Sequence, residues 1–116
     1  MVLKVDHVDI KVHDVDAEVA FLQLIGLEIK RRLPDHNNSV EMIVPGEESP
    51  VIEIHPCGDT EPGLRHVAFK SSDPKLVENL KDAGYQFKNS NTLIASTGRT
   101  VSNVFDPSGL IWQITD

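Results

Sequence analysis

The sequence predicts an α+β protein in which two tandem βαβββ modules form a cup-shaped mixed sheet with helices on its outer face. The first observation behind this prediction is a repeated phrase. The segment "VDHVDIKVHD" (residues 5–14) is matched by "LRHVAFKSSD" (residues 64–73), which places His7 and His66 59 residues apart and gives Asp14 and Asp73 the same spacing. Self-similarity at a fixed period indicates a duplicated supersecondary unit.

The second observation is that the register persists along the chain. Gly26 and Gly84 lie 58 residues apart, and "VIEI" (51–54) matches "IWQI" (111–114). The repeat therefore predicts module one at about residues 1–58 and module two at about residues 62–116. Because 116 residues suit one compact domain, the two modules are expected to share a single domain over residues 1–116.

The elements of module one follow from periodicity and end signals. Residues 5–12 alternate as a strand, and Asp14 or Asp16 opens a helix that Gly26 ends. Three shorter β-rich runs follow, "LEIKRRL", "SVEMIV" and "VIEIH", with "PGEESP" as the turn before the last of them. The expected apolar stripe of the helix consists of Val19, Phe21, Leu22 and Ile25.

Module two repeats this pattern. "RHVAFKS" alternates as a strand, and Asp73 is the expected N-cap of a helix with Pro74 at its first position. The β-rich runs "YQFK", "TLIAS", "TVSNVF" and "LIWQIT" follow, and "FDPSG" predicts a tight turn before the last strand. The helical stripe comprises Leu76, Val77, Leu80 and Ala83, and Gly84 closes the helix.

Composition excludes several classes of function. A formal net charge of -7 repels nucleic acid and anionic membrane surfaces, so neither is an expected partner. Cys57 is the only cysteine, which excludes an internal disulfide and a thiolate metal cluster. No secretory signal or membrane span is recognisable, so a cytoplasmic location is expected.

The alternation of the strands gathers polar residues on one face. His7, Glu53, His66 and Gln113 all lie opposite the face that a helix is expected to cover. Two imidazoles, one carboxylate and one amide oxygen suit a borderline divalent ion such as Zn, Ni, Co, Mn or Fe. The sequence therefore predicts a metal site at these four residues.

The segments "DHVDIKVHD", "FLQLIGLEI", "RHVAF" and "VFDPSGLIWQI" resemble the vicinal oxygen chelate superfamily. Its members include glyoxalase I, methylmalonyl-CoA epimerase, bleomycin-resistance proteins and extradiol dioxygenases. The resemblance covers nearly the whole chain and implies one metal ligand from the first and one from the last strand of each module. Those positions are again His7, Glu53, His66 and Gln113, and the resemblance also implies a homodimer.

The resemblance leaves the activity open. Gln113 stands where glyoxalase I and the epimerase usually have a glutamate, and an amide is no general base near neutral pH. The main hypothesis is a metal-dependent lyase or isomerase of the glyoxalase I type, acting through an enediolate with Glu53 as ligand and base. A metal-free binding module of the bleomycin-resistance type is the alternative, and a dioxygenase is a weaker one.

The positions of other polar residues also predict roles for them. Lys11, Lys70 and Arg99 are predicted to bind an anionic small-molecule substrate, since the two lysines repeat 59 residues apart on the ligand face. His55, two residues after Glu53 on the same face, could replace a ligand or orient Glu53, but it is expected to line the mouth of the cup. His13 and His36 are expected to face solvent.

Overall fold

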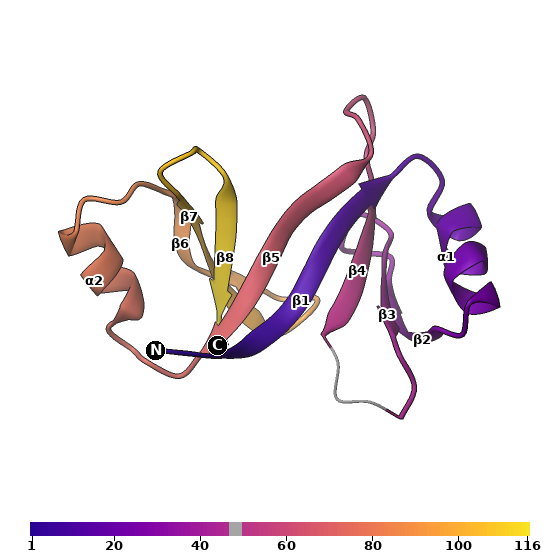
Figure 1. The fold of residues 1–116 in the computed structure, drawn as a ribbon, viewed down its shortest axis with the longest axis horizontal. Coiled ribbons are helices and arrows are strands. Elements are labelled where there is room, and N and C mark those ends of the chain that lie inside the picture. Colours follow the sequence, from indigo (N-terminus) through magenta and orange to yellow (C-terminus); the bar gives the residue numbers. More distant parts are fainter. Residues whose placement is uncertain (47–49) are drawn as a thin grey trace. The chain divides into compact units, whose positions relative to one another are not determined.

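The computed structural model describes residues 1–46 and 50–116 and contains the βαβββ order twice, which confirms the predicted α+β class (Figure 1). The predicted "PGEESP" turn lies in part outside the described residues. The elements are β1 (Val2–Val12), α1 (Val15–Leu24), β2 (Glu28–Leu33), β3 (Ser39–Ile43), β4 (Val51–Pro56), β5 (Gly63–Ser71), α2 (Leu76–Asp82), β6 (Phe87–Ile94), β7 (Arg99–Phe105) and β8 (Ile111–Thr115).

The chain divides into two compact units. The N-terminal unit is His7–Arg65, and the C-terminal unit combines Met1–Asp6 with His66–Asp116. In the N-terminal unit the strand order is β2-β3-β4-β1, with β1 parallel to β4 and the other pairs antiparallel. The sheet of this unit is therefore mixed, as predicted.

Helix α1 is held at both ends by the predicted residues. The Asp14 carboxylate accepts a hydrogen bond from the Ala17 amide at 3.0 Å, which identifies Asp14 rather than Asp16 as the N-cap. At the other end Gly26 has a φ of 108°, and the Leu27 amide donates to the Leu22 carbonyl. This Schellman arrangement explains why a glycine is needed there.

The core of the N-terminal unit lies between α1 and the strands β2, β3 and β4, which α1 contacts (Figure 1). Val19 and Leu22 of the predicted stripe pack into it. The prediction was wrong for Phe21 and Ile25, whose side chains are 56% and 62% exposed. Phe21 follows Val19 by two residues and so lies on the opposite side of the helix, and Ile25 is the C-cap, beyond the last helical residue. The buried core residues are Val12, Val19, Val40, Met42 and Ile54.

The C-terminal unit has the strand order β5-β8-β7-β6, with β5 parallel to β8 and the other pairs antiparallel. The runs "YQFK" and "TLIAS", expected as separate strands, contribute to the single strand β6, whose pairing with β7 is interrupted by two register shifts. Each shift bends the strand without ending it, so alternation is lost while pairing continues. Phe69 and Trp112 stack at 5.6 Å on adjacent strands.

Helix α2 begins later than predicted. Asp73 accepts from the Lys75 amide at 2.9 Å in a turn that precedes the helix, and the first helical residue is Leu76 rather than Pro74. The C-terminal end is as predicted: Gly84 has a φ of 95°, and the Tyr85 amide donates to the Leu80 carbonyl. None of the residues of α2 is fully buried.

Candidate metal centre

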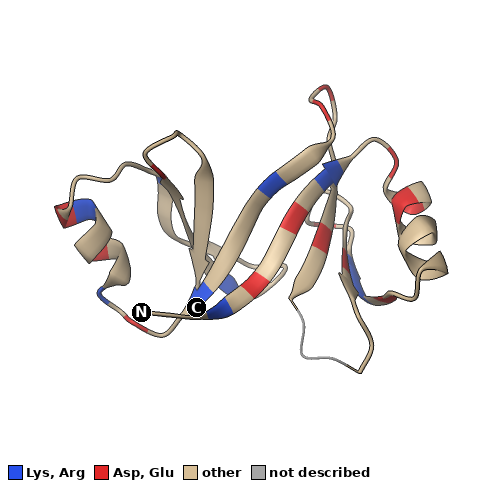
Figure 2. Ribbon diagram, in the orientation of Figure 1, with Lys and Arg blue, Asp and Glu red and all other residues tan. Residues whose placement is uncertain are grey.

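A row of three carboxylates crosses the sheet of the N-terminal unit. Glu41 on β3 is paired with Glu53 on β4, and Glu53 is paired with Asp9 on β1. All three side chains are on adjacent strands at the same level, and none is more than 3% exposed. Figure 2 shows the acidic positions of β1 and β4 side by side. We call Glu41, Glu53 and Asp9 the acidic row.

The two ends of the acidic row are neutralised by partners within the unit. Glu41 binds Arg31, its neighbour on β2, through two hydrogen bonds of 2.7 and 3.3 Å. This bond, with the charge of Glu41, raises the pKa of Arg31 above its usual value. Asp9 accepts a 2.7 Å hydrogen bond from Nδ1 of His55, and its second oxygen lies 3.6 Å from Arg65.

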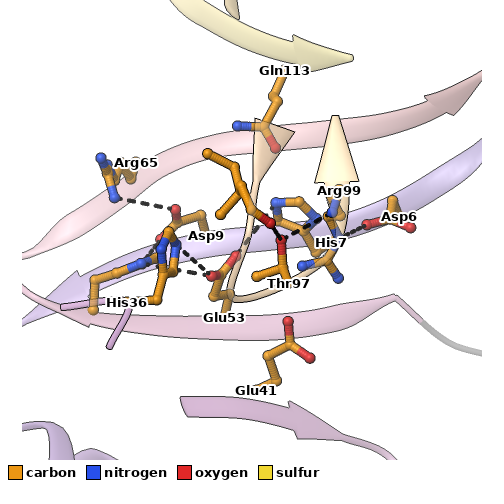
Figure 3. Close-up of polar contacts among 12 residues, drawn as sticks. Asp6, His7, Asp9, His36, Glu41, Glu53, Arg65, Thr97, Arg99 and Gln113 are labelled. Carbon is orange, nitrogen blue, oxygen red and sulfur yellow. Dashed lines mark hydrogen bonds and ion pairs between the residues drawn. The ribbon is translucent and has the colours of Figure 1, made fainter. Parts of the chain in front are cut away.

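The central carboxylate of the acidic row is different. Glu53 Oε1 is buried and has no hydrogen-bond partner, although two ring nitrogens are close to it: His36 Nε2 at 3.5 Å and His55 Nε2 at 3.6 Å. The other oxygen, Oε2, lies 3.5 Å from Nε2 of His7. In Figure 3 dashed lines run from Glu53 toward His36 on one side and His7 on the other.

These distances are longer than hydrogen bonds but suit a shared divalent ion. Ligand atoms about 2.1 Å from a tetrahedral zinc ion are about 3.4 Å from one another. The ligand atoms of His36, Glu53 and His55 all lie within 4.8 Å of one another. His55 Nε2 is itself buried without a hydrogen-bond partner, so two buried polar atoms that lack hydrogen bonds lie 3.6 Å apart. The residues therefore fit a divalent metal.

The surroundings of His55 and His36 favour ring forms that can bind a metal. Because Nδ1 of His55 donates to Asp9, its Nε2 carries the lone pair that a metal would accept. His36 comes from the loop between β2 and β3, where Asn37 and Asn38 adopt φ values of 54° and 53°. Burial lowers the pKa of His36, which favours the neutral imidazole that binds metals.

The C-terminal unit carries a neutral counterpart of the acidic row. Asn89, Asn103 and Gln113 are paired across β6, β7 and β8. The Gln113 amide donates to Asn103 Oδ1 at 3.1 Å, and the Asn103 amide donates to Asn89 Oδ1 at 2.8 Å. We call these three residues the amide row. Gln113 is therefore held by a hydrogen-bonded chain of amides.

The four predicted metal ligands are divided between the two units. His7 and Glu53 lie together in the N-terminal unit, whereas His66 and Gln113 belong to the C-terminal unit. All four side chains are buried, as their strand positions suggest. The complete set of four ligands stays a prediction.

The predicted substrate-binding residues are separated in the same way. Lys11 donates to Thr60 Oγ1 at 3.0 Å and lines a pocket of about 570 Å³ in the N-terminal unit. Arg99 is paired with Asp6 at 3.1 Å, and Lys70 is a half-buried residue of β5. The pocket also includes His55, Cys57 and Arg65, so it borders the candidate metal centre.

Several residues of the centre were missed or misplaced by sequence reasoning. His36 was expected to face solvent, but its side chain is only 26% exposed and lies 3.5 Å from Glu53. Asp9 follows His7 by two residues and so shares its strand face, but the sequence alone indicated no role for Asp9 or Arg65. Alternation together with a carboxylate two residues after His7 was the available signal for Asp9; the loop position of His36 gave none.

The comparisons with known proteins establish the family. The model of the Glyoxalase/Bleomycin resistance protein/Dioxygenase superfamily matches residues 4–114. The chain therefore belongs to this superfamily, and the predicted resemblance to vicinal oxygen chelate proteins is confirmed. No curated protein sequence matches the chain significantly.

Solved structures with the same fold include methylmalonyl-CoA epimerases. The Mycobacterium tuberculosis enzyme is 18% identical with a TM-score of 0.81, over 98% of this chain and 87% of that one. A Streptomyces coelicolor epimerase variant in complex with 2-nitronate-propionyl-CoA is 18% identical with a TM-score of 0.78, over 99% and 97% of the two chains. A third epimerase, in complex with methylmalonyl-CoA and NH4+, has a TM-score of 0.78 at 18% identity, over 99% and 94%. These likenesses establish the fold.

Among the described residues, no helix combines the length and the apolar character needed to cross a bilayer.

Proposed function

We propose that this protein is a divalent-metal-dependent lyase or isomerase that moves a carbon-bound proton in a small substrate with two neighbouring oxygen atoms. The observation that carries the proposal is the buried, unpartnered Oε1 of Glu53 beside two imidazole nitrogens. Burial of a carboxylate oxygen that accepts no hydrogen bond costs free energy unless a cation binds to it. Members of the same fold that act on methylmalonyl-CoA give the substrate class to test first.

A bound divalent ion would supply Lewis-acid stabilisation of the negative charge that develops on the substrate oxygens. The protein itself supplies the proton acceptor, and Glu53 is the better candidate than Gln113 because an amide cannot accept a proton near neutral pH. Delivery of a proton to the opposite face of the same carbon, from water or a second acid, would give an epimer, and return of the proton from Glu53 to a neighbouring atom of the intermediate would complete an isomerisation.

The pocket beside His55 is suited to the anionic part of such a substrate. Lys11 and Arg65 both line it. Among the described residues, Asp9 is the only acidic residue that forms an ion pair with Arg65, at 3.6 Å. Lysine and arginine bind carboxylates and phosphates through charge-assisted hydrogen bonds. A thioester with a charged carrier group therefore matches the pocket better than a neutral ketone does. Lys70 and Arg99 remain further candidates for the same role.

Solvent hydrogen exchange tests the proposed chemistry directly. Protein purified without chelator and loaded in turn with Zn, Ni, Co, Mn or Fe is incubated in deuterium oxide with methylmalonyl-CoA or a glutathione hemithioacetal. We expect metal-dependent deuterium incorporation at the carbon next to the carbonyl, detected by mass spectrometry. Absence of exchange in every metal form with both substrates would remove the proposal.

The variant Glu53→Gln separates the roles of the carboxylate. We expect it to abolish exchange while metal binding stays measurable, because the amide keeps an oxygen donor but cannot accept the proton. Glu41→Gln is the matched control: it removes a second buried carboxylate of the acidic row, which is already bound to Arg31. Equal loss of exchange in both folded variants would show that Glu53 has no special role.

The second candidate function is a metal-free binding module of the bleomycin-resistance type. The amide row favours it, because Gln113 is committed to a structural hydrogen bond with Asn103 instead of being a carboxylate. Isothermal titration of apo protein with small anionic ligands tests this alternative. Binding that is unchanged by metal, together with no exchange activity, would favour the binding module.

We also propose a homodimer, which the resemblance implies, and a cytoplasmic location. Light scattering of the purified chain measures the first, with twice the monomer mass expected. Fractionation of cells that carry the untagged protein measures the second. A monomer at micromolar concentration would remove the dimer without affecting the metal chemistry.

A further inference from the structure

We infer that the divalent ion is bound by His36, Glu53 and His55, all within the N-terminal unit, with Asp9 as a positioning residue for His55. This ligand set shares only Glu53 with the set His7, Glu53, His66 and Gln113 expected from the repeat. The inference deepens the proposed function because it specifies where the ion binds, and it rests on that function only in requiring a metal.

The first argument is the set of distances between the candidate ligand atoms. His36 Nε2 and His55 Nε2 lie 3.5 and 3.6 Å from the same oxygen, Glu53 Oε1. At such distances neither nitrogen forms a hydrogen bond with that oxygen, and both separations are close to the edge of a tetrahedron of ligands around zinc, about 3.4 Å. A single ion between the three atoms would satisfy Oε1 and the buried His55 Nε2 at once.

The second argument is electrostatic. Arg31 neutralises one end of the acidic row and Arg65 lies near the other. Among the described residues, no arginine forms an ion pair with Glu53, the central member. Adjacent carboxylates on neighbouring strands repel one another, and burial strengthens that repulsion. A divalent cation at Oε1 would relieve it at the position where the row lacks positive charge.

The third argument is the support given to His55. Its Nδ1 donates to Asp9 at 2.7 Å, and both side chains are buried. A carboxylate that accepts the second ring proton of a histidine fixes the tautomer and the orientation in which the first nitrogen binds metal. Arg65, 3.6 Å from the other oxygen of Asp9, holds that carboxylate in turn.

The ligand chemistry limits which ions fit. Two imidazoles and one carboxylate form a set of three protein ligands, which is typical of catalytic zinc sites that keep a further position open for water or substrate. The absence of a thiolate disfavours Cu(I), and the imidazoles favour Zn, Ni or Co over Mg or Ca. Of the three ligands, His55 also lines the pocket of about 570 Å³, and we expect a substrate to approach the open position from there.

Cobalt titration of variants distinguishes the two ligand sets. We expect His36→Ala and His55→Ala each to weaken Co(II) affinity by more than 100-fold, and to abolish the intense visible absorption of a tetrahedral site. The double variant His66→Ala/Gln113→Ala, which removes both predicted ligands of the C-terminal unit, is expected to change affinity less than threefold. Circular dichroism and thermal melts of the apo proteins verify that each variant is folded.

Asp9 has its own test. We expect Asp9→Ala to weaken Co(II) affinity 10-fold to 100-fold, the usual range for an outer-shell carboxylate, with partial recovery in Asp9→Asn, which keeps an acceptor for Nδ1. Asp59→Asn, a change at an exposed carboxylate in the same unit, is the control. An effect on the apo melting temperature alone, with metal affinity unchanged, would show that Asp9 is merely structural.

The outcomes separate this inference from the proposed function. Cobalt affinity lost in His66→Ala/Gln113→Ala but retained in His36→Ala would overturn the inference and leave a metal-dependent enzyme with the expected ligands. A protein that binds cobalt through His36 and His55 yet catalyses no exchange would support the inference and remove the proposed function. Failure of the parent protein to bind any of Zn, Ni, Co, Mn or Fe would remove both.

Discussion

Glu53 and Gln113 occupy the same position in the two repeats and have opposite surroundings. Glu53 is paired with Glu41 on β3 and with Asp9 on β1, whereas Gln113 is paired with Asn103 on β7 and Ala68 on β5. The duplicated strands thus carry a charged row in one half and a neutral, hydrogen-bonded row in the other. The two halves therefore share a backbone arrangement but differ in the chemistry of these side chains, and we expect a cation to bind in the first half alone.

The core beneath α1 is the first stability test. Ile54 is completely buried among Val19, Val40 and Met42, so Ile54→Ala is expected to lower the free energy of unfolding by about 2–5 kcal/mol through lost burial and an unfilled cavity. Urea unfolding followed by circular dichroism measures the change. Leu24→Ala, at a side chain that is 86% exposed on α1, is the control and should change the stability by less than about 0.5 kcal/mol.

The ion pair at the end of the acidic row is the second test. Arg31→Met removes the guanidinium bound to the fully buried Glu41, and the expected destabilisation is about 1–3 kcal/mol because a buried carboxylate loses charged hydrogen bonds. The double variant Arg31→Met/Glu41→Gln should recover much of that loss, since the charge disappears with its partner. Equal stability of the single and double variants would contradict this interpretation.

The elements that the sequence predicted well are those with local signals. Asp14 and the paired glycines Gly26 and Gly84 define helix ends through hydrogen bonds between residues close in the chain. Strand alternation likewise placed His7 and Glu53 on one face, and they lie 3.5 Å apart. These features depend only on the alternation of side chains along a strand and on the residues that cap helix ends.

The features that the sequence did not reveal depend on tertiary contacts. His36 lies 3.5 Å from Glu53 in a loop where the next two residues, Asn37 and Asn38, adopt left-handed conformations. The spacing of apolar residues along the sequence does not predict the conformation of such a loop. Phe21 is exposed because of the way α1 is oriented on the strands. The apolar residues of the helix do not by themselves show which of them will face the sheet. The register shifts within β6 are similarly invisible to alternation.

The turn between β7 and β8 gives a pH-dependent prediction. Hydrogen bonds from the Trp112 indole at 2.9 Å, and then from backbone amides including Leu110 and Ser108, lower the pKa of Asp106. A carboxyl with a lowered folded pKa binds fewer protons in the folded state, so its stabilisation is complete above the unfolded pKa near 3.8. That stabilisation is lost as the pH falls through the lower, folded pKa.

Melting temperatures of the parent and Asp106→Asn between pH 6 and pH 2 test this linkage. We expect the parent to be the more stable above pH 4 and the difference to shrink below it, because protonation removes the charge that the variant already lacks. Asp82→Asn, at an exposed residue of α2, is the control and should leave the difference from the parent nearly constant. A difference for Asp106→Asn that is independent of pH would contradict the assigned role of the charge.

Gln113→Glu tests whether the amide row opposes a second carboxylate in this fold. The carboxylate cannot donate to Asn103 Oδ1, so two acceptors would face each other unless the Asn103 amide rotates and gives up its own bond to Asn89. Either outcome leaves a polar group of the buried row unsatisfied, and we expect a loss of about 1–3 kcal/mol in the apo protein, measured by urea unfolding. Gln86→Glu, at an exposed position, is the control. If added Zn or Co restored the stability of Gln113→Glu beyond that of the parent, the C-terminal unit would contribute a metal ligand after all, and confinement of the ion to the first half would be wrong.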